Sequence, residues 1–137
     1  MSKSDTFEND LLLLILNNTN IANIGDATGL RGSSTAGSLY WALHTADPGE
    51  SGSATTSEAA YTGYARVAVA RSGSGIVVTG SSASPAADTD FGACTASAGS
   101  ALTHFSLVNT SSGSGKILWS GTLTPNITMA VGVIRSD

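Results

Sequence analysis

The sequence predicts an all-β fold, a single-domain β-sandwich or jelly-roll-like structure with a short N-terminal helix and a long N-terminal loop arm. Two observations predict this class. Short apolar segments of strand character follow one another along residues 38–137, and turns rich in glycine and serine separate them. No segment of helical length alternates with these strands, as a parallel α/β fold would require. We therefore expect a helix and loop arm over residues 1–37 and a β-sandwich body over residues 38–137.

Composition limits the partners that the chain can have. Of its 137 residues 12% are charged, against about 25% in a typical soluble protein. Serine, threonine, alanine and 16 glycines take the place of the charged residues. The net charge is −4 and the 6 basic residues are scattered, so the sequence offers no positive patch for phosphate groups. We expect no nucleic-acid partner, and a surface of small uncharged groups that suits dense packing beside other copies.

An N-terminal helix is predicted over residues 4–17. Ser4 or Asp5 can cap it, and Glu8 stands three residues after Asp5, as in a capping box. Apolar side chains then recur at helical spacing until Asn17-Asn18 ends the pattern. The apolar stripe is broad, so the helix must be buried either against the chain's own β body or against a neighbouring subunit.

The apolar run inside this helix is too short to cross a membrane. It covers residues 11–16, whereas a spanning helix needs about 20 residues. Acidic residues precede the run, where a secretory signal carries positive charge. We expect no membrane partner and assembly in the cytoplasm without export.

A long loop is predicted over residues 17–38. Loops longer than about 12 to 15 residues are usually either functional or disordered. Ile21, Ile24 and Leu30 interrupt its polar sequence, and these side chains would not be stable in water on a free linker. We expect a partly ordered arm that lies on a surface, either its own or that of a neighbour.

The strands of the body are predicted from apolar alternation and from β-branched and aromatic content. On the first strand Leu39, Trp41 and Leu43 share one face. We expect Trp41 and Trp119 to be core residues. The predicted strands cover residues 39–44, 64–70, 75–79, 89–92, 102–108, 116–123 and 127–134, with a further short pairing at 81–83.

The two histidines do not form a recognisable catalytic or metal site. His44 and His104 would need a third metal ligand, and Asp47 is the only carboxylate near either of them in sequence. We expect surface or interface imidazoles bonded to a neighbouring backbone. Serine is abundant, but no Gly-x-Ser-x-Gly segment stands between a strand and a helix, where a hydrolase carries its nucleophile. These observations predict that the protein is not an enzyme.

The remaining chemistry-bearing residues favour structural interpretations. Cys94 is the single cysteine and has no base beside it, so we expect a small buried side chain. Asp88 and Asp90 are a close pair, but no regular calcium loop matches their spacing, and we expect solvated carboxylates. The other loop carboxylates considered with them are Asp26, Asp47 and Glu50. The sequence predicts no cofactor and no metal ion.

One stretch is distinctive, residues 38–50, which read SLYWALHTADPGE. It resembles the signature LYxALHTADPGE of a family of small virion proteins of tailed bacteriophages and prophages. Three further stretches are similar to that family and occur in the same order. They read GYAR at residues 63–66, LTHF at 102–105 and LWSGTL at 118–123.

The resemblance implies a structural component of a phage particle. Members are often described as tail-fibre proteins, and their size and shape are also similar to those of capsid decoration, or cement, proteins. We favour a cement protein, because the chain has no shaft-forming repeat and no separate receptor-binding tip. It would bind the outside of the head shell as a homotrimer and clamp adjacent subunits of the major capsid protein. A tail or tail-fibre attachment protein is the alternative.

The predicted binding surfaces are apolar and small-polar. Relatives usually continue with another apolar strand after the point where this chain ends, so we expect one sheet edge to be open or completed by a neighbour. A glycan-binding module is the rival class, and it would need exposed aromatic platforms, although only 6% of the residues are aromatic. The interface candidates are Phe7, Leu11, Leu12, Ile15, Ile21, Ile24, Leu30 and Arg31.

Overall fold

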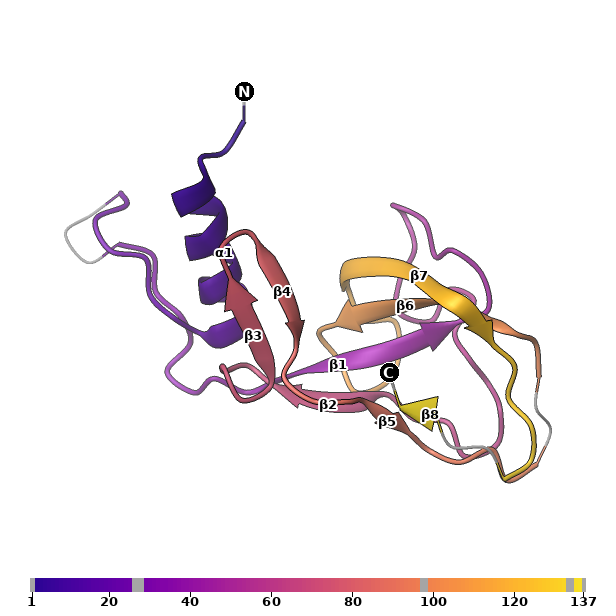
Figure 1. Ribbon diagram of the computed structural model, residues 1–137. Coiled ribbons are helices and arrows are strands. Elements are labelled where there is room, and N and C mark those ends of the chain that lie inside the picture. The colour runs from indigo at the N-terminus through magenta and orange to yellow at the C-terminus, as the bar shows by residue number, and fades with distance from the viewer. Residues whose placement is uncertain (1, 26–28, 97–98, 133–134, 137) are drawn as a thin grey trace. The chain divides into compact units, whose positions relative to one another are not determined.

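The all-β class is confirmed by the computed structural model in Figure 1, which describes residues 2–25, 29–96, 99–132 and 135–136. Among these residues a single helix, α1 (Asp5–Asn17), precedes the strands. Strand pairings of known register are antiparallel. The strands are β1 (Ser38–His44), β2 (Val67–Ala70), β3 (Ile76–Thr79), β4 (Ser82–Pro85), β5 (Asp90–Phe91), β6 (Leu102–Val108), β7 (Ile117–Ile127) and β8 (Arg135–Ser136).

The chain forms two compact units, and each is described by itself. Unit 1 comprises Met1–Ser38 and Val69–Ala87, and unit 2 comprises Leu39–Ala68 and Asp88–Asp137. Unit 1 therefore joins the helix and the loop arm to a hairpin from the middle of the chain. The boundary predicted between residues 37 and 38 lies one residue before the point where the chain leaves unit 1 and enters unit 2, between Ser38 and Leu39. The division into two domains stays a prediction.

The strands β1, β6 and β7 of unit 2 belong to a four-stranded sheet with the order β2-β1-β6-β7, and the chain passes from unit 2 to unit 1 within β2, at Val69. Along β1 and β6, Trp41 stands opposite Leu107 and His44 stands opposite His104. Leu107 in turn stands opposite Trp119 of β7, so these three residues form one row across three strands. The ladder between β6 and β7 shifts register at two places, between Leu102 and His104 and between Leu107 and Val108.

The central strand β1 is buried on both of its faces. Leu43 belongs to the larger hydrophobic cluster, against which Trp41 packs, whereas Ala42 on the opposite face belongs to a smaller cluster with Ala54 and Val108. Phe91 brings β5 against the sheet as a member of the larger cluster. Both clusters lie in unit 2. The buried members of the larger one are Leu43, Ala59, Tyr61, Phe91, Cys94, Leu102, Ile127 and Met129, which confirms the prediction for Cys94.

In unit 1, helix α1 begins and ends where the sequence predicts. Ser4 is its N-cap, and the Ser4 hydroxyl accepts a hydrogen bond from the backbone N–H of Phe7 at 3.4 Å. At the other end Asn18 adopts the left-handed conformation, with φ 57°, that commonly closes a helix. The N–H groups of Asn18 and Thr19 both donate to the carbonyl oxygen of Leu13. No helix in the described residues is long and apolar enough to span a membrane.

Arg71 completes the C-terminal end of α1 from a distant segment of the chain. Its Nε donates to the carbonyl oxygen of Ile15 at 2.8 Å, and its Nη2 donates to that of Leu14 at 2.9 Å. Its Nη1 donates to the carbonyl oxygen of Ala36 at 3.1 Å. The last turn of α1 has no basic residue of its own. Arg71 therefore supplies both the donors and the positive charge that this end of a helix favours.

The other half of unit 1 is the hairpin of β3 and β4, which contacts α1. Asn9 on the helix donates through Nδ2 to the carbonyl oxygen of Gly80 in the hairpin turn at 2.7 Å. Leu16 and Ile76 are each 2% exposed and form the buried apolar portion of this contact region. All of β4 is exposed.

The long loop folds back on itself near its base. Ile21 and Leu30 exchange two backbone hydrogen bonds, of 2.9 and 2.8 Å. The Asn18 side chain binds both backbone groups of Ser33, accepting from its N–H at 2.7 Å and donating to its carbonyl at 2.8 Å. The loop is thus ordered at its base, as predicted for the arm, and whether it meets a neighbour stays a prediction.

Several strand predictions are wrong in extent. The second strand begins at Val67 and not at residue 64, because the Tyr64 N–H is used in a turn with the carbonyl of Tyr61. The last predicted strand, 127–134, is wrong over residues 128–132, which are in no strand, because β7 ends at Ile127. Residues 133–134 lie outside the described residues. Trp119 is 41% exposed and is not a core residue, because β7 is the edge of its sheet.

Candidate functional site

His44 and Ser106 form a buried polar pair in the sheet of unit 2. His44 Nε2 lies 2.7 Å from Ser106 Oγ, and His44 Nδ1 lies 2.9 Å from the carbonyl oxygen of Thr56. Because a carbonyl oxygen can only accept, Nδ1 carries the proton, and Nε2 of the neutral ring accepts from the Ser106 hydroxyl. Burial lowers the pKa of His44 below its ordinary value of 6.5, which favours this neutral ring.

The distance between His44 Nε2 and Ser106 Oγ is the one expected of a catalytic nucleophile and its base, but the environment of the pair is not that of a catalytic site. His44 and Ser106 are both 0% exposed, so no substrate reaches the hydroxyl. The second ring nitrogen binds a backbone carbonyl where a triad would place a carboxylate. The pair therefore satisfies polar groups inside the sheet. The predicted surface or interface position is wrong for His44, because the sheet covers it, although the predicted bond to a neighbouring backbone is found.

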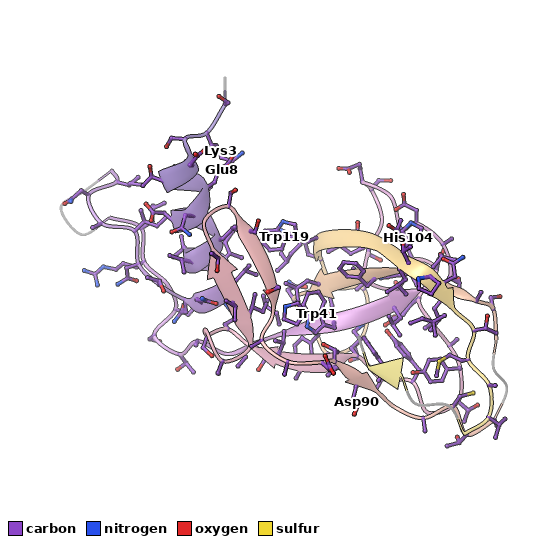
Figure 2. The ribbon with its side chains drawn as sticks, in the orientation of Figure 1. Lys3, Glu8, Trp41, Asp90, His104 and Trp119 are labelled. Carbon is purple, nitrogen blue, oxygen red and sulfur yellow. The ribbon has the colours of Figure 1, made fainter. Side chains whose placement is uncertain are left out.

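His104 lies beside this pair on β6 and is labelled in Figure 2. Its side chain is half-buried, and its Nδ1 lies 2.8 Å from the hydroxyl oxygen of Thr103. The two histidines face each other across the β1–β6 ladder. Among the described residues, no group of three or more His, Cys, Asp or Glu side chains could hold a metal ion.

A second polar cluster surrounds the guanidinium of Arg66. Its Nε and Nη2 lie 2.7 and 2.8 Å from the two carboxylate oxygens of Glu58. Nη1 donates to the carbonyl and the hydroxyl of Thr110, both at 3.0 Å, and Nη2 donates to the carbonyl of Gly113 at 2.7 Å. The Tyr64 hydroxyl donates to Glu58 at 3.1 Å. This cluster joins the segment after β1 to the turn before β7, and Arg66 has only 2% of its side chain exposed.

The loop carboxylates do not converge in the described residues. Asp47 is bonded within its own turn, where its Oδ1 accepts from the N–H of Gly49 at 2.9 Å. Gly49 has φ 68°, so the predicted Asp-Pro-Gly turn is found. Asp88 and Asp90 are exposed, and Figure 2 shows Asp90 on β5. Asp26 lies outside the described residues.

The interface candidates on α1 are only partly exposed to solvent. Phe7, Leu11, Leu12 and Ile15 are all half-buried, whereas Leu16 is the buried residue of the helix. At 100° per residue, Phe7 and Leu11 lie on the side of α1 opposite to Leu16. A broad apolar portion of α1 therefore keeps some exposed surface, and its role in binding stays a prediction.

The interface candidates on the loop differ in exposure. Ile21 is 4% exposed, so its side chain is already covered within the chain. Ile24 is half-buried, and Leu30 and Arg31 are exposed. The structure thus leaves Leu30 and Arg31 accessible next to the bridge that closes the loop. All eight candidates belong to unit 1.

Sequence reasoning missed the surface around Trp119. This side chain lies on β7, the outermost strand of the sheet, and Figure 2 shows it on that strand. A tryptophan in an alternating strand is typical of a core residue when only the sequence is considered. Its exposure depends on the order of the strands, which local sequence does not carry.

The described residues define a small all-β protein whose two polar clusters are bonded internally, and whose large exposed apolar side chains are Leu30, Val77, Trp119 and Val131. The chain belongs to the family described as Podophage GP4 fiber I protein gp80, whose model matches residues 2–135. It is accordingly a member of a phage virion structural protein family. No curated protein matches the chain.

Proposed function

We propose that the protein is a non-enzymatic structural subunit of the phage tail or fibre, which acts by binding other virion proteins. The observation that carries this proposal is the family description, which names a podophage fibre protein over nearly the whole chain. That description favours the tail or fibre location over a location on the head.

The contact surface would be provided by unit 1. Its buried apolar side chains are Leu16, Ile21 and Ile76. Most apolar residues of α1 remain half-buried, so another protein surface placed on the helix would remove more apolar area from water.

A capsid decoration protein is the second candidate. It is favoured by the absence of a shaft-forming repeat from these 137 residues. In that role homotrimers would clamp adjacent subunits of the major capsid protein on the outside of the head. Because the clamp would bind only the assembled shell, it would stabilise the shell by linkage, with a small contribution from each copy.

Copy number in purified particles separates the two locations. Quantitative mass spectrometry would compare this protein with the major capsid protein. A tail or fibre subunit would be present at a small fraction of the capsid protein, which is the expected result. An amount comparable to the capsid protein would reject the fibre location and support decoration of the head. Immunogold labelling of intact particles provides an independent location.

A charged substitution on α1 tests whether unit 1 provides the contact surface. We expect Leu11→Glu to abolish incorporation into particles while the chain stays folded, because the carboxylate would have to be desolvated in the contact. Ser112→Glu, in an exposed turn of unit 2, is the matched control and should be incorporated normally. Normal incorporation of Leu11→Glu would show that α1 is not the contact surface.

A further inference from the structure

One face of α1 is used by the chain's own hairpin. Asn9 binds the carbonyl oxygen of Gly80 in the hairpin turn, and Leu16 is the buried residue of the helix. At 100° per residue, Asn9 and Leu16 lie within about 20° of each other around the helix axis, so they belong to the same face. Figure 1 shows the hairpin of β3 and β4 along one side of α1.

A second apolar face lies on the opposite side of α1. Around the helix axis its members follow one another in the order Leu14, Phe7, Leu11 and Ile15, and together they span about 100°. All four side chains are half-buried. An apolar stripe of this width is typical of a helix face that packs against a core. This face therefore has the composition of a packing surface and keeps some contact with water.

Carboxylates border the stripe on both sides. Asp10 lies about 40° beyond Leu14, and Glu8 lies about 20° beyond Ile15 on the other side. Neither carboxylate side chain belongs to a fully buried residue. The stripe is thus an apolar centre with a negative border.

The stability of the helix explains only part of this charge. Asp5 and Glu8 lie in the first turn, where a carboxylate stabilises the positive end of a helix. Lys3 Nζ lies 3.8 Å from Glu8 Oε1, and Figure 2 labels both residues at the start of α1. Asp10 lies beyond the first turn and takes part in neither of the two ion pairs of the described residues. Its charge beside the stripe therefore has no role in capping the helix.

The sign of the border selects the kind of partner. Helices that lie on membranes carry lysine or arginine beside their apolar face, because the lipid surface is negative. A lipid surface and the phosphates of nucleic acid would both repel the carboxylates of α1. A protein surface with an apolar centre and a basic border would match both features of the stripe.

We propose that α1 docks through its apolar stripe into an apolar groove of another virion protein, and that lysine or arginine side chains border this groove beside Glu8 and Asp10. The inference rests on the proposed function, in which unit 1 provides the contact surface. The stripe supplies most of the affinity, while the border charges orient the helix and speed the encounter. Because these charges lie at the rim of the contact, salt weakens their contribution.

Removal of both border charges tests the chemistry of the partner. Glu8→Gln with Asp10→Asn should weaken binding of the purified chain to particles that lack it by about three- to tenfold, because two partly exposed ion pairs are lost. A rise from about 0.05 M to about 0.5 M NaCl should weaken binding of the wild type and leave that of the double variant nearly unchanged. Co-sedimentation of the labelled chain with the particles measures the affinity, and circular dichroism checks the helix.

Two further variants serve as controls. Asp88→Asn with Asp90→Asn makes the same change in net charge at exposed carboxylates of unit 2 and should bind like the wild type. Asp10→Asn alone leaves the first turn of α1 unchanged and should still weaken binding by about twofold.

Failure of this inference and failure of the contact surface give different results. If Leu11→Glu does not bind but the Glu8→Gln, Asp10→Asn variant binds like the wild type at every salt concentration, the contact on α1 stands and the basic border is rejected. If Leu11→Glu binds like the wild type, both are rejected. Tighter binding of the wild type at high salt, or its binding to phosphatidylglycerol vesicles, also overturns the inference, since the partner surface would then be uncharged or acidic, or a lipid.

Discussion

The two units of the chain bury their apolar side chains to different extents. Unit 2 contains both hydrophobic clusters, and its central strand β1 is covered on both faces. In unit 1 the buried apolar side chains are Leu16, Ile21 and Ile76, although α1 is mostly apolar. Because buried apolar area is the main source of stability, unit 2 has the larger share of what stabilises the chain.

Unit 1 relies instead on side chains that bind backbone groups. Arg71 binds the end of α1, Asn9 binds the hairpin turn, and Asn18 binds the base of the loop. A net hydrogen bond contributes about 1 kcal/mol, less than a well-buried leucine. Unit 2 therefore has the larger apolar core, and α1 in unit 1 keeps half-buried apolar side chains, which we propose as a contact surface for another virion protein.

The largest loss of stability is expected from replacing Arg66, whose guanidinium lies in the polar cluster of unit 2. Arg66→Met leaves the carboxylate of Glu58 without its charged partner in a largely buried place. Breaking a buried ion pair from one side costs about 3–5 kcal/mol. We expect the free energy of unfolding, measured by urea denaturation, to fall by that amount.

Two further variants show whether the loss comes from the buried pair. Arg31→Met removes an exposed arginine and should change the free energy of unfolding by less than about 0.5 kcal/mol. Glu58→Gln combined with Arg66→Met removes both charges and should cost less than Arg66→Met alone. If the double variant were the less stable of the two, the carboxylate would not be the source of the loss.

The second largest effect is expected in unit 1 and should stay local. Arg71→Gln removes the charged donors from the carbonyls of Leu14 and Ile15. Hydrogen bonds to charged groups contribute about 1.5–3 kcal/mol, so we expect a loss of about 2 kcal/mol in the local stability of α1. Hydrogen exchange should become faster at the α1 amides and stay unchanged in β1 and β6. Equal acceleration in both units would show that they do not differ in the way proposed.

The pH dependence of stability should come from His44 in unit 2. Desolvation is the largest influence on its pKa and lowers it, and the charges of Arg66 and His104 act in the same direction. The hydrogen bond to Thr56 and the charge of Glu58 act in the opposite direction but are smaller.

The sign of the effect follows from the lowered pKa. As the pH falls below 6.5, the unfolded chain binds a proton at His44 before the folded chain does, so the free energy of unfolding declines until the pH passes the lowered pKa of the folded state. Above pH 6.5 this contribution is fully present. We expect a smaller change than in the two arginine variants, and an NMR titration of the His44 ring checks its origin. A ring that titrates at or above 6.5 would contradict the prediction.

Much of the fold could be predicted because its signals are local. The alternation in residues 39–44 and 102–108 and the asparagines after α1 each depend on neighbouring residues, and the structure confirms them. The contact of α1 with a hairpin from residues 76–85 could not be predicted, because it depends on pairing between distant segments. The role of Arg71 was missed for the same reason.

The polar clusters show the same limit at the candidate site. His44 was recognised as a polar residue on an apolar strand, but its partner Ser106 is 62 residues away and gives no local signal. The exposure of Trp119 depends on the strand order β2-β1-β6-β7, and no pattern within its own strand reveals that order. Sequence therefore identified the residue types correctly but not which of them the fold leaves accessible.

The smallest effect is expected from Asp47, in the signature stretch of unit 2. Asp47→Ala removes one hydrogen bond to the N–H of Gly49 in an exposed turn and should cost about 0.5–1 kcal/mol. Virion incorporation should be unchanged, because the signature residues His44, Tyr64 and Arg66 all serve bonds within unit 2. Thermal denaturation and the protein content of purified particles measure the two quantities. A folded Asp47→Ala variant that is missing from particles would make the signature turn a contact surface, and unit 2 would then share the binding role assigned to unit 1.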